Sequence, residues 1–172
     1  MNKILEGAEA RGAETKLWNF SDVDIKPCNS CWGCKNGEHG CVIKDDMRKL
    51  YDALDKADAL VLGTPVYMGQ MSAQAKIFTD RLFASSQFSP RFSPYFKETN
   101  AARKKLIIVF TQGNPDAGKF QVYFDYTKDM FQFLNFDVKD IVVVAGMRNE
   151  AARERKDLDA AMKACGSSLV LG

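Results

Sequence analysis

The sequence is poor in several features that mark particular classes of protein. It has one histidine, His39, among 172 residues, and its formal net charge is only +2. A single histidine argues against Ser–His–Asp hydrolases and zinc peptidases, because their sites need a histidine base or several histidine ligands. The nearly balanced charge gives no electrostatic reason to expect a nucleic-acid or membrane partner.

Long apolar runs and targeting signals are also missing. The longest apolar runs, such as 107–110 and 141–145, are far too short to cross a bilayer. No secretory signal is visible, so we expect a cytoplasmic protein whose thiols stay reduced. Apolar residues make up 46% and charged residues 27% of the chain, and its length predicts a single domain over 1–172.

Cysteine is scarce but concentrated, because four of the five cysteines share the spacing C-x2-C-x2-C-x6-C. They are Cys28, Cys31, Cys34 and Cys41. Neither a helix nor a strand returns every third residue to one side for long, so a tight loop over 27–41 is predicted. We expect Gly33, Gly37 and Gly40 to supply its backbone freedom.

Three interpretations of this cysteine loop remain open. A compact C-x2-C-x2-C with a fourth cysteine nearby is typical of a thiolate-bound iron–sulfur cluster. Structural zinc more often splits its ligands into two separated pairs. The third interpretation is a loop of free thiols that binds no metal.

The apolar pattern predicts helices and strands in alternation. Helices are expected over 2–11, 44–56, 73–83, 122–133 and 150–164, and strands over 15–20, 59–63, 106–110 and 138–145. This order favours an α/β fold with a doubly wound parallel sheet covered by helices on both faces. The segment 84–104 is too long for a plain connection and is interpreted as a lid or a subunit contact.

Ligands of such sheets bind at the carboxyl ends of the strands. The cysteine loop, residues 64–72 and residues 111–115 are all expected to meet at that edge. The second loop, with Tyr67, Met68 and Met71, suits a flat heteroaromatic ligand, although a plain strand-to-helix turn with core methionines is the alternative.

Two of these motifs together resemble a known family. The run from Asp24 through the four cysteines to Met47, and the run Gly63-Thr64-Pro65-Val66-Tyr67-Met68-Gly69 with Met71-Ser72-Ala73-Gln74, are similar to those of the iron–sulfur flavoproteins. These belong to the flavodoxin-like NAD(P)H-dependent FMN reductases. Residues 111–114 resemble the second ring-contacting loop of that family.

The resemblance implies an FMN-dependent oxidoreductase or electron-transfer flavoprotein with a [4Fe-4S] cluster on the four cysteines. The implied flavin contacts are Thr64, Pro65, Val66, Tyr67, Met68, Gly69, Met71, Ser72, Thr111, Gln112, Gly113 and Asn114. The implied partners are a nicotinamide or ferredoxin-like electron donor and further copies of the chain, as a homodimer or homotetramer. The alternatives are a metal-free FMN or quinone reductase and a flavodoxin-like scaffold without a cofactor.

The chain also departs from the family pattern. Family members begin with an apolar strand and a Ser/Thr-rich loop that binds the FMN phosphate, whereas this sequence starts within the helix that would follow. We therefore expect a flavodoxin-like sheet without its usual first strand and phosphate-binding loop. A truncated start is the favoured explanation; a strand from a partner chain and a sheet that closes over the gap are the alternatives.

Overall fold

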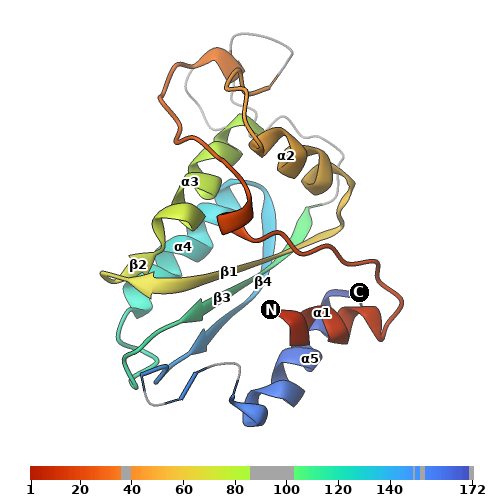
Figure 1. Ribbon diagram of the computed structural model, residues 1–172, viewed down its shortest axis with the longest axis vertical. Helices are drawn as coiled ribbons and strands as arrows, with labels where there is room; N and C mark the ends of the chain where they lie inside the picture. The colour runs from red at the N-terminus through yellow and green to blue at the C-terminus, as the bar shows by residue number, and fades with distance from the viewer. Residues whose placement is uncertain (36–39, 86–102, 149, 152–153, 171–172) are drawn as a thin grey trace.

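The computed structural model describes residues 1–35, 40–85, 103–148, 150–151 and 154–170. Its sheet has the order β2-β1-β3-β4. The strands are β1 (Ala59–Tyr67), β2 (Gln70–Met71), β3 (Lys104–Thr111) and β4 (Phe136–Val144). β1, β3 and β4 run parallel, and β2 pairs antiparallel with the end of β1. The predicted parallel α/β architecture is confirmed (Figure 1).

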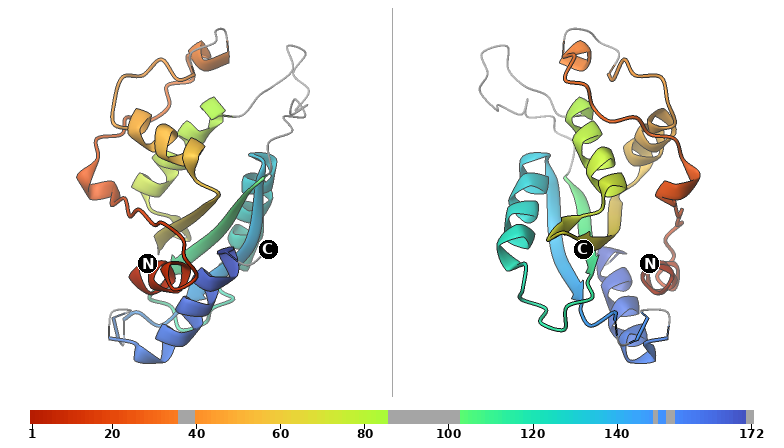
Figure 2. Two further views of the ribbon diagram at one scale, coloured as in Figure 1. Left: turned by 90° about the vertical axis from the view of Figure 1, so that its right-hand side faces the viewer. Right: turned by 60° about the vertical axis from the view of Figure 1, so that its left-hand side comes forward.

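Helices cover the sheet on both faces, and alternate residues of β3 separate two cores. Leu106, Ile108 and Phe110 pack with α2 (Met47–Lys56), α3 (Ala73–Arg81) and α4 (Gln121–Phe133). Ile107 and Val109 pack on the other face with α1 (Asn2–Glu9) and α5 (Asp159–Val170). The wholly apolar sequence of β3 follows from this double burial. Helices α1 and α5 lie side by side (Figures 1 and 2).

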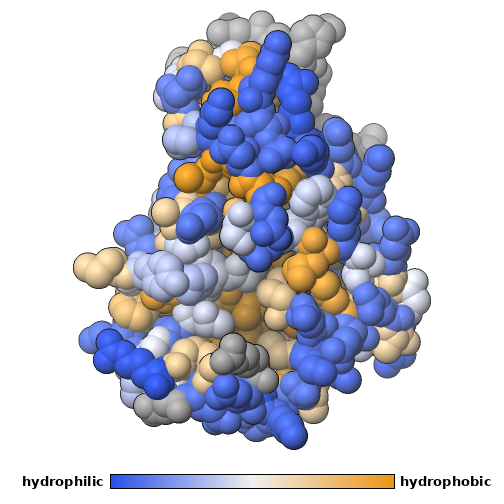
Figure 3. Space-filling model, in the orientation of Figure 1, coloured by the Kyte–Doolittle hydropathy of each residue, from blue (hydrophilic) through white to orange (hydrophobic). Residues whose placement is uncertain are grey.

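The strand predicted over 15–20 is wrong. Residues 14–19 have no regular structure, and a short 3-10 helix follows at Phe20–Asp22. A strand needs a hydrogen-bonded neighbour, and the outer edge of β1 has no strand beside residues 59–65 in the described chain. Trp18 and Phe20 instead pack against the α2–α4 core. Apolar surface lies over β1, beside α1 (Figure 3).

Two further boundaries differ from the sequence prediction. β1 continues four residues beyond Gly63, so the expected loop 64–72 contains the end of a strand and a hairpin. The helix expected over 150–164 begins at Asp159 and ends at Val170. Packing of Gly166 against α1 and of Leu169 in the core overrides the low helix propensity of glycine. Most of the segment 84–104 lies outside the described residues.

Candidate functional site

The hairpin at the end of β1 presents two large apolar side chains to solvent. Tyr67 pairs with Gln70, and Met68 and Gly69 form the turn with φ of 50° and 82°. Positive φ at both central residues matches the right-handed twist of the strands that they connect. The side chain of Tyr67 is 63% exposed and that of Met68 is fully exposed. The tip therefore offers an aromatic ring and a thioether at the edge of the sheet.

Three of the predicted flavin contacts from the same segment have buried side chains. Thr64 Oγ1 accepts a hydrogen bond from the Ser72 amide at 3.0 Å, and Ser72 Oγ accepts one from the Ala75 amide at 3.4 Å. Met71 is buried, and its amide donates to Tyr123 Oη. These hydrogen bonds join the end of β1 to the start of α3.

The second predicted ring loop begins where β3 ends. Gln112 is buried, and its Nε2 donates to the carbonyl oxygens of Asn114 and Asp116 at 3.2 and 2.6 Å. Its amide donates to Val144 O, which ties this loop to β4. Gln112 Oε1 is buried without a hydrogen-bond partner in the described chain. A buried acceptor of this kind is costly unless something donates to it.

The parallel pairing of Pro65 with Thr111 brings the two predicted ring loops to the same edge of the sheet. A Cβ on Gly69 would lie 3.5 Å from the ring of Phe120, which follows the second loop and precedes α4. A Cβ on Gly113 would lie 3.0 Å from the side chain of Arg148. The sequence prediction missed Phe120 and Arg148, because neither lies in a recognisable motif.

A groove of about 340 Å³ lies between α3 and α4, next to the hairpin. Its lining combines aromatic and thioether groups with one ion pair at the rim. The lining residues are Gln70, Met71, Lys76, Asp80, Tyr123, Tyr126, Thr127 and Met130. The sequence prediction assigned Tyr123 and Tyr126 no role. Their i, i+3 spacing on one helix was the available signal.

The cysteine loop lies away from these two loops. α3 starts beside Thr64 at the carboxyl edge of the sheet, whereas its last residue, Arg81, contacts the two ends of the cysteine loop. Figure 1 shows the loop at the far end of α3 from the hairpin. The prediction that all three loops meet at one edge is therefore wrong for the cysteine loop. Helix α3 separates it from the other two.

The four predicted ligands are only partly gathered. Cys28 and Cys31 are exposed, and Cys34 and Cys41 are half-buried. No three His, Cys, Asp or Glu side chains converge on one point within the described ranges. Burial raises the pKa of the Cys34 thiol above its usual value, against the opposing effect of Lys35. Four thiols are the donor type that binds an iron–sulfur or zinc group, but in the described residues their side chains do not converge on one point.

The backbone of this loop differs from the prediction. Gly40 takes a positive φ, as expected, but Ser30 and Trp32 also do, with φ of 55° and 58°. A Cβ on Gly33 would lie 2.7 Å from Val42, so that glycine allows a close approach, and Gly37 lies outside the described residues. Left-handed conformations cost energy in residues with a side chain, so neighbouring contacts must hold the loop in place.

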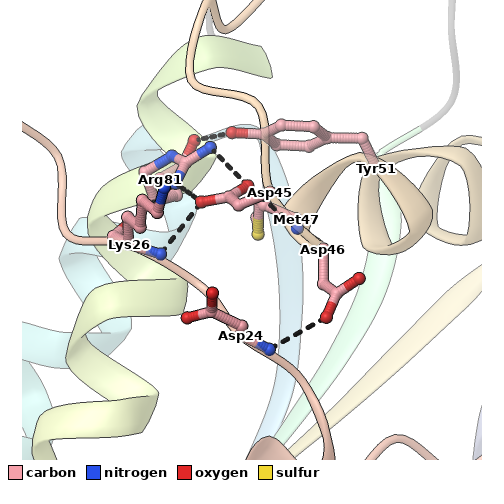
Figure 4. A network of polar contacts seen from close by, with 7 residues as sticks. All are labelled: Asp24, Lys26, Asp45, Asp46, Met47, Tyr51 and Arg81. Atoms are coloured by element: carbon pink, nitrogen blue, oxygen red, sulfur yellow. Dashed lines mark hydrogen bonds and ion pairs between the residues drawn. The ribbon is translucent and has the colours of Figure 1, made fainter.

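A buried ion pair fixes the base of the loop (Figure 4). Arg81 Nη1 lies 2.6 Å from Asp45 Oδ2, and each side chain is 1% exposed. Burial raises the pKa of Asp45, but hydrogen bonds from Arg81 and from the amides of Lys26 and Met47 outweigh it and hold the pKa below its usual value. Nearer the tip, Lys35 Nζ donates to Phe83 O and lies 4.4 Å from the Phe83 ring.

Known proteins match this chain in sequence and in fold. The sequence profile of the NADPH-dependent FMN reductases matches residues 1–145. An iron-sulfur flavoprotein of Methanosarcina thermophila is 40% identical over 77 residues, 45% of this chain and 40% of its own. One of Archaeoglobus fulgidus is 42% identical over 81 residues, 47% of this chain and 41% of its own. The chain thus spans about two fifths of the length of these relatives.

The solved structures agree with the α/β fold. The NAD(P)H:quinone oxidoreductase of Methanothermobacter marburgensis superimposes with a TM-score of 0.69 at 15% identity, over 98% of this chain and 86% of its own. At that identity the likeness concerns the fold alone. No helix within the described ranges combines the length and the apolar character that a membrane span needs.

Proposed function

The chain belongs to the NADPH-dependent FMN reductase family, and from this we propose that it is an FMN-dependent oxidoreductase whose flavin ring binds between the two strand-end loops. The observation that supports the proposal is the parallel pairing of Pro65 with Thr111, because β1 and β3 then end side by side at the same edge of the sheet. The carboxyl ends of parallel strands are where such folds bind their ligands.

The residues of this edge fit the ring end of FMN. Tyr67 is exposed and offers a face on which a flat ring stacks. In this proposal, backbone amides near Gly69 and Gly113 donate to a ring carbonyl, and Gln112 Oε1, which has no donor in the described chain, accepts from a ring N–H. The bound flavin supplies hydride and single-electron chemistry. The protein orients the ring and limits the access of water to it.

A comparison of FMN with riboflavin tests this assignment. The two ligands share the ring and differ in the phosphate. If the strand-end loops provide the contacts, riboflavin should bind within about threefold of FMN in fluorescence titrations, a difference below 1 kcal/mol. Absence of binding by either ligand up to millimolar concentration would contradict the proposal.

We propose a nicotinamide as the electron donor, from the name of the family. With FMN bound, anaerobic addition of NADPH or NADH should bleach the flavin absorbance in a stopped-flow experiment. A flavin that is reduced by dithionite but by neither nicotinamide would point instead to a ferredoxin-like donor.

We further propose that Cys28, Cys31, Cys34 and Cys41 hold a [4Fe-4S] cluster. The support is the donor set: four thiols in one segment, whose flanking residues Lys26 and Asp45 are joined by a hydrogen bond of 2.9 Å. The names of the archaeal relatives agree. Such a cluster transfers single electrons. After anaerobic reconstitution, about four iron and four acid-labile sulfide per chain are expected for a cubane cluster.

A metal-free FMN or quinone reductase is the second candidate. It is favoured by one observation, that no three ligand side chains converge in the described part of the chain. Flavin binding with no uptake of iron or sulfide would select this candidate over the first.

We also propose that the chain forms a homodimer or homotetramer. The support is the outer side of α4, where Val122, Tyr126 and Phe133 are exposed. Apolar side chains gathered on one helix face are typical of a contact surface. Light scattering after size exclusion measures the mass of the assembly, and a monomer at micromolar concentration would contradict the proposal.

A further inference from the structure

One buried arginine joins three parts of the chain that are far apart in sequence. Arg81, the last residue of α3, donates from Nη1 to Lys26 O at 2.7 Å and to Asp45 Oδ2 at 2.6 Å. Its Nη2 donates to Asp45 Oδ1 at 3.2 Å. Lys26 and Asp45 stand immediately before and after the segment 27–44, which holds all four cysteines. The guanidinium therefore bridges the two ends of the cysteine loop.

Backbone contacts at the same place complete the closure. Asp45 Oδ2 accepts from the Lys26 amide at 2.9 Å, and Asp45 Oδ1 accepts from the Met47 amide at 3.1 Å. One step outward, the Asp24 amide donates to Asp46 Oδ2 at 2.9 Å. Figure 4 shows these bonds in one cluster, with Tyr51 Oη donating to the Arg81 carbonyl. The loop thus leaves and re-enters the domain at a single point.

The chemistry of the pair requires arginine. The planar guanidinium binds both carboxylate oxygens and still reaches a carbonyl, whereas an ammonium group acts as a single point charge. Removing an ion pair from water offsets most of its attraction, so this pair contributes little net stability. Its main consequence is geometric, because it fixes where each end of the loop begins.

The third nitrogen of the guanidinium, Nε, takes no part in the bonds to Asp45 and Lys26. Arg81 Nε is buried and has no hydrogen-bond partner among the described residues. The hydrogen bonds to Lys26 O and to Asp45 place this unused N–H at the base of the loop that carries the four candidate metal ligands.

We propose that Arg81 is the positioning residue of the cysteine loop: it closes the base of the loop through Asp45 and Lys26, and it keeps its Nε–H available for a sulfur of the loop's metal group. The second half of this inference rests on the proposed cluster. The first half does not, because the closure is present in the chain itself. Hydrogen bonds to cluster sulfurs stabilise the reduced form, so loss of this donor makes the cluster harder to reduce.

Hydrogen exchange on the metal-free full chain tests the closure. In Arg81→Lys and Asp45→Asn, the amides of Asp24, Lys26 and Met47 should exchange about 100-fold faster, as expected when one partner of a buried pair is lost. Lys76→Gln is the matched control, because it breaks the exposed Lys76–Asp80 pair on the same helix. Its exchange in this region should equal that of the wild type.

Two results of the hydrogen-exchange measurement would overturn the closure. Unchanged protection of the three amides in both variants overturns the closure. If the amides of β3 lose as much protection as the amides of Asp24, Lys26 and Met47, the closure is also overturned. The pair would then stabilise the whole domain and not the loop in particular. Should Arg81→Lys not fold, Asp45→Asn carries the test, since it keeps the shape of the side chain and removes only its charge.

Reconstitution with iron and sulfide tests the second half. Arg81→Lys should take up less iron than the wild type under the same conditions, and its cluster should have a more negative midpoint potential in an anaerobic redox titration. Equal iron content and equal potential would overturn the role toward the sulfurs. If the wild type itself takes up no iron, the proposed cluster fails, while hydrogen exchange still decides the closure.

Discussion

The carbonyl oxygen of Ile4 lies only 1.8 Å from the position that a Cβ on Gly166 would occupy. Helices α1 and α5 therefore touch backbone to backbone. Gly7 makes the reciprocal approach, where a Cβ would lie 2.0 Å from Lys163 O. This contact holds α1 on the sheet face formed by Ile107 and Val109.

Gly166→Ala should therefore destabilise the protein, although alanine is the better helix former. Overpacking against a backbone atom should lower the free energy of unfolding by about 3 kcal/mol, more than the roughly 1 kcal/mol that alanine gains within a helix. Urea unfolding followed by circular dichroism measures the difference. Ser168→Ala, at an exposed position of the same helix, is the control, and equal midpoints for the two variants would contradict the prediction.

Tyr67→Ala should weaken FMN binding about tenfold. The reason is the loss of a ring-stacking contact, which contributes about 0.5–1.5 kcal/mol beyond the buried area. Fluorescence titration measures the affinity. Leu17→Ala removes an apolar side chain of similar exposure, 52% against 63%, from a segment with no proposed role in binding, and its affinity for FMN should not change. Similar losses in both variants would show that the ring does not bind at the hairpin tip.

Gln112→Ala should destabilise the second ring loop. The carbonyls of Asn114 and Asp116 would each lose a hydrogen bond from Nε2, at a combined cost of about 1–3 kcal/mol. Removing the unpartnered Oε1 offsets part of this cost. Thermal unfolding measures the net effect. Gln121→Ala, which loses only the exposed bond to Asp125, should leave the unfolding midpoint nearly unchanged.

Asp45 should make stability depend on pH in the acid range. Its pKa in the folded chain lies below the value of 3.8 that is usual for aspartate, so the unfolded chain takes up the proton more readily. The stabilisation is fully present above that value and is lost as pH falls through the lower folded pKa. Asp45→Asn should flatten the acid limb of a plot of unfolding free energy against pH below about pH 4. An acid limb identical to the wild type would contradict this assignment.

The local pattern of the sequence was sufficient for most elements of the fold. The alternation of apolar runs and amphipathic segments predicted β1, β3, β4 and the helices α1 to α4 near their observed positions, because burial on one or both faces imposes its period on the residues. The spacing of the cysteines predicted a loop, and the structure has one. The residues that make the hairpin and the second ring loop were also visible as motifs.

The features that the local sequence pattern failed to predict depend on tertiary contacts between distant residues. Residues 15–20 show the polar–apolar alternation of a strand, yet they form no strand because no strand of the described chain pairs with them. Instead, the side chains of Trp18 and Phe20 pack against the core. The end of α5 was misplaced because the fit of Gly166 against Ile4, which keeps the helix going beyond residue 164, cannot be read from a single segment. Thr64 and Ser72 stay predicted ligand contacts, but the sequence could not show that their hydroxyl groups bond to the chain itself.

The sequence by itself determined the class of fold, the family motifs and the set of thiols, because these depend on residue type and spacing. Only the tertiary structure decided that the cysteine loop lies at the opposite end of α3 from the hairpin after β1, and that Arg81 and Asp45 form a buried ion pair at its base. The physical reason is that an α-helix rises by about 1.5 Å per residue, so motifs at its start and at its end lie far apart in space. A buried ion pair between distant residues likewise exists only once the chain has folded around it.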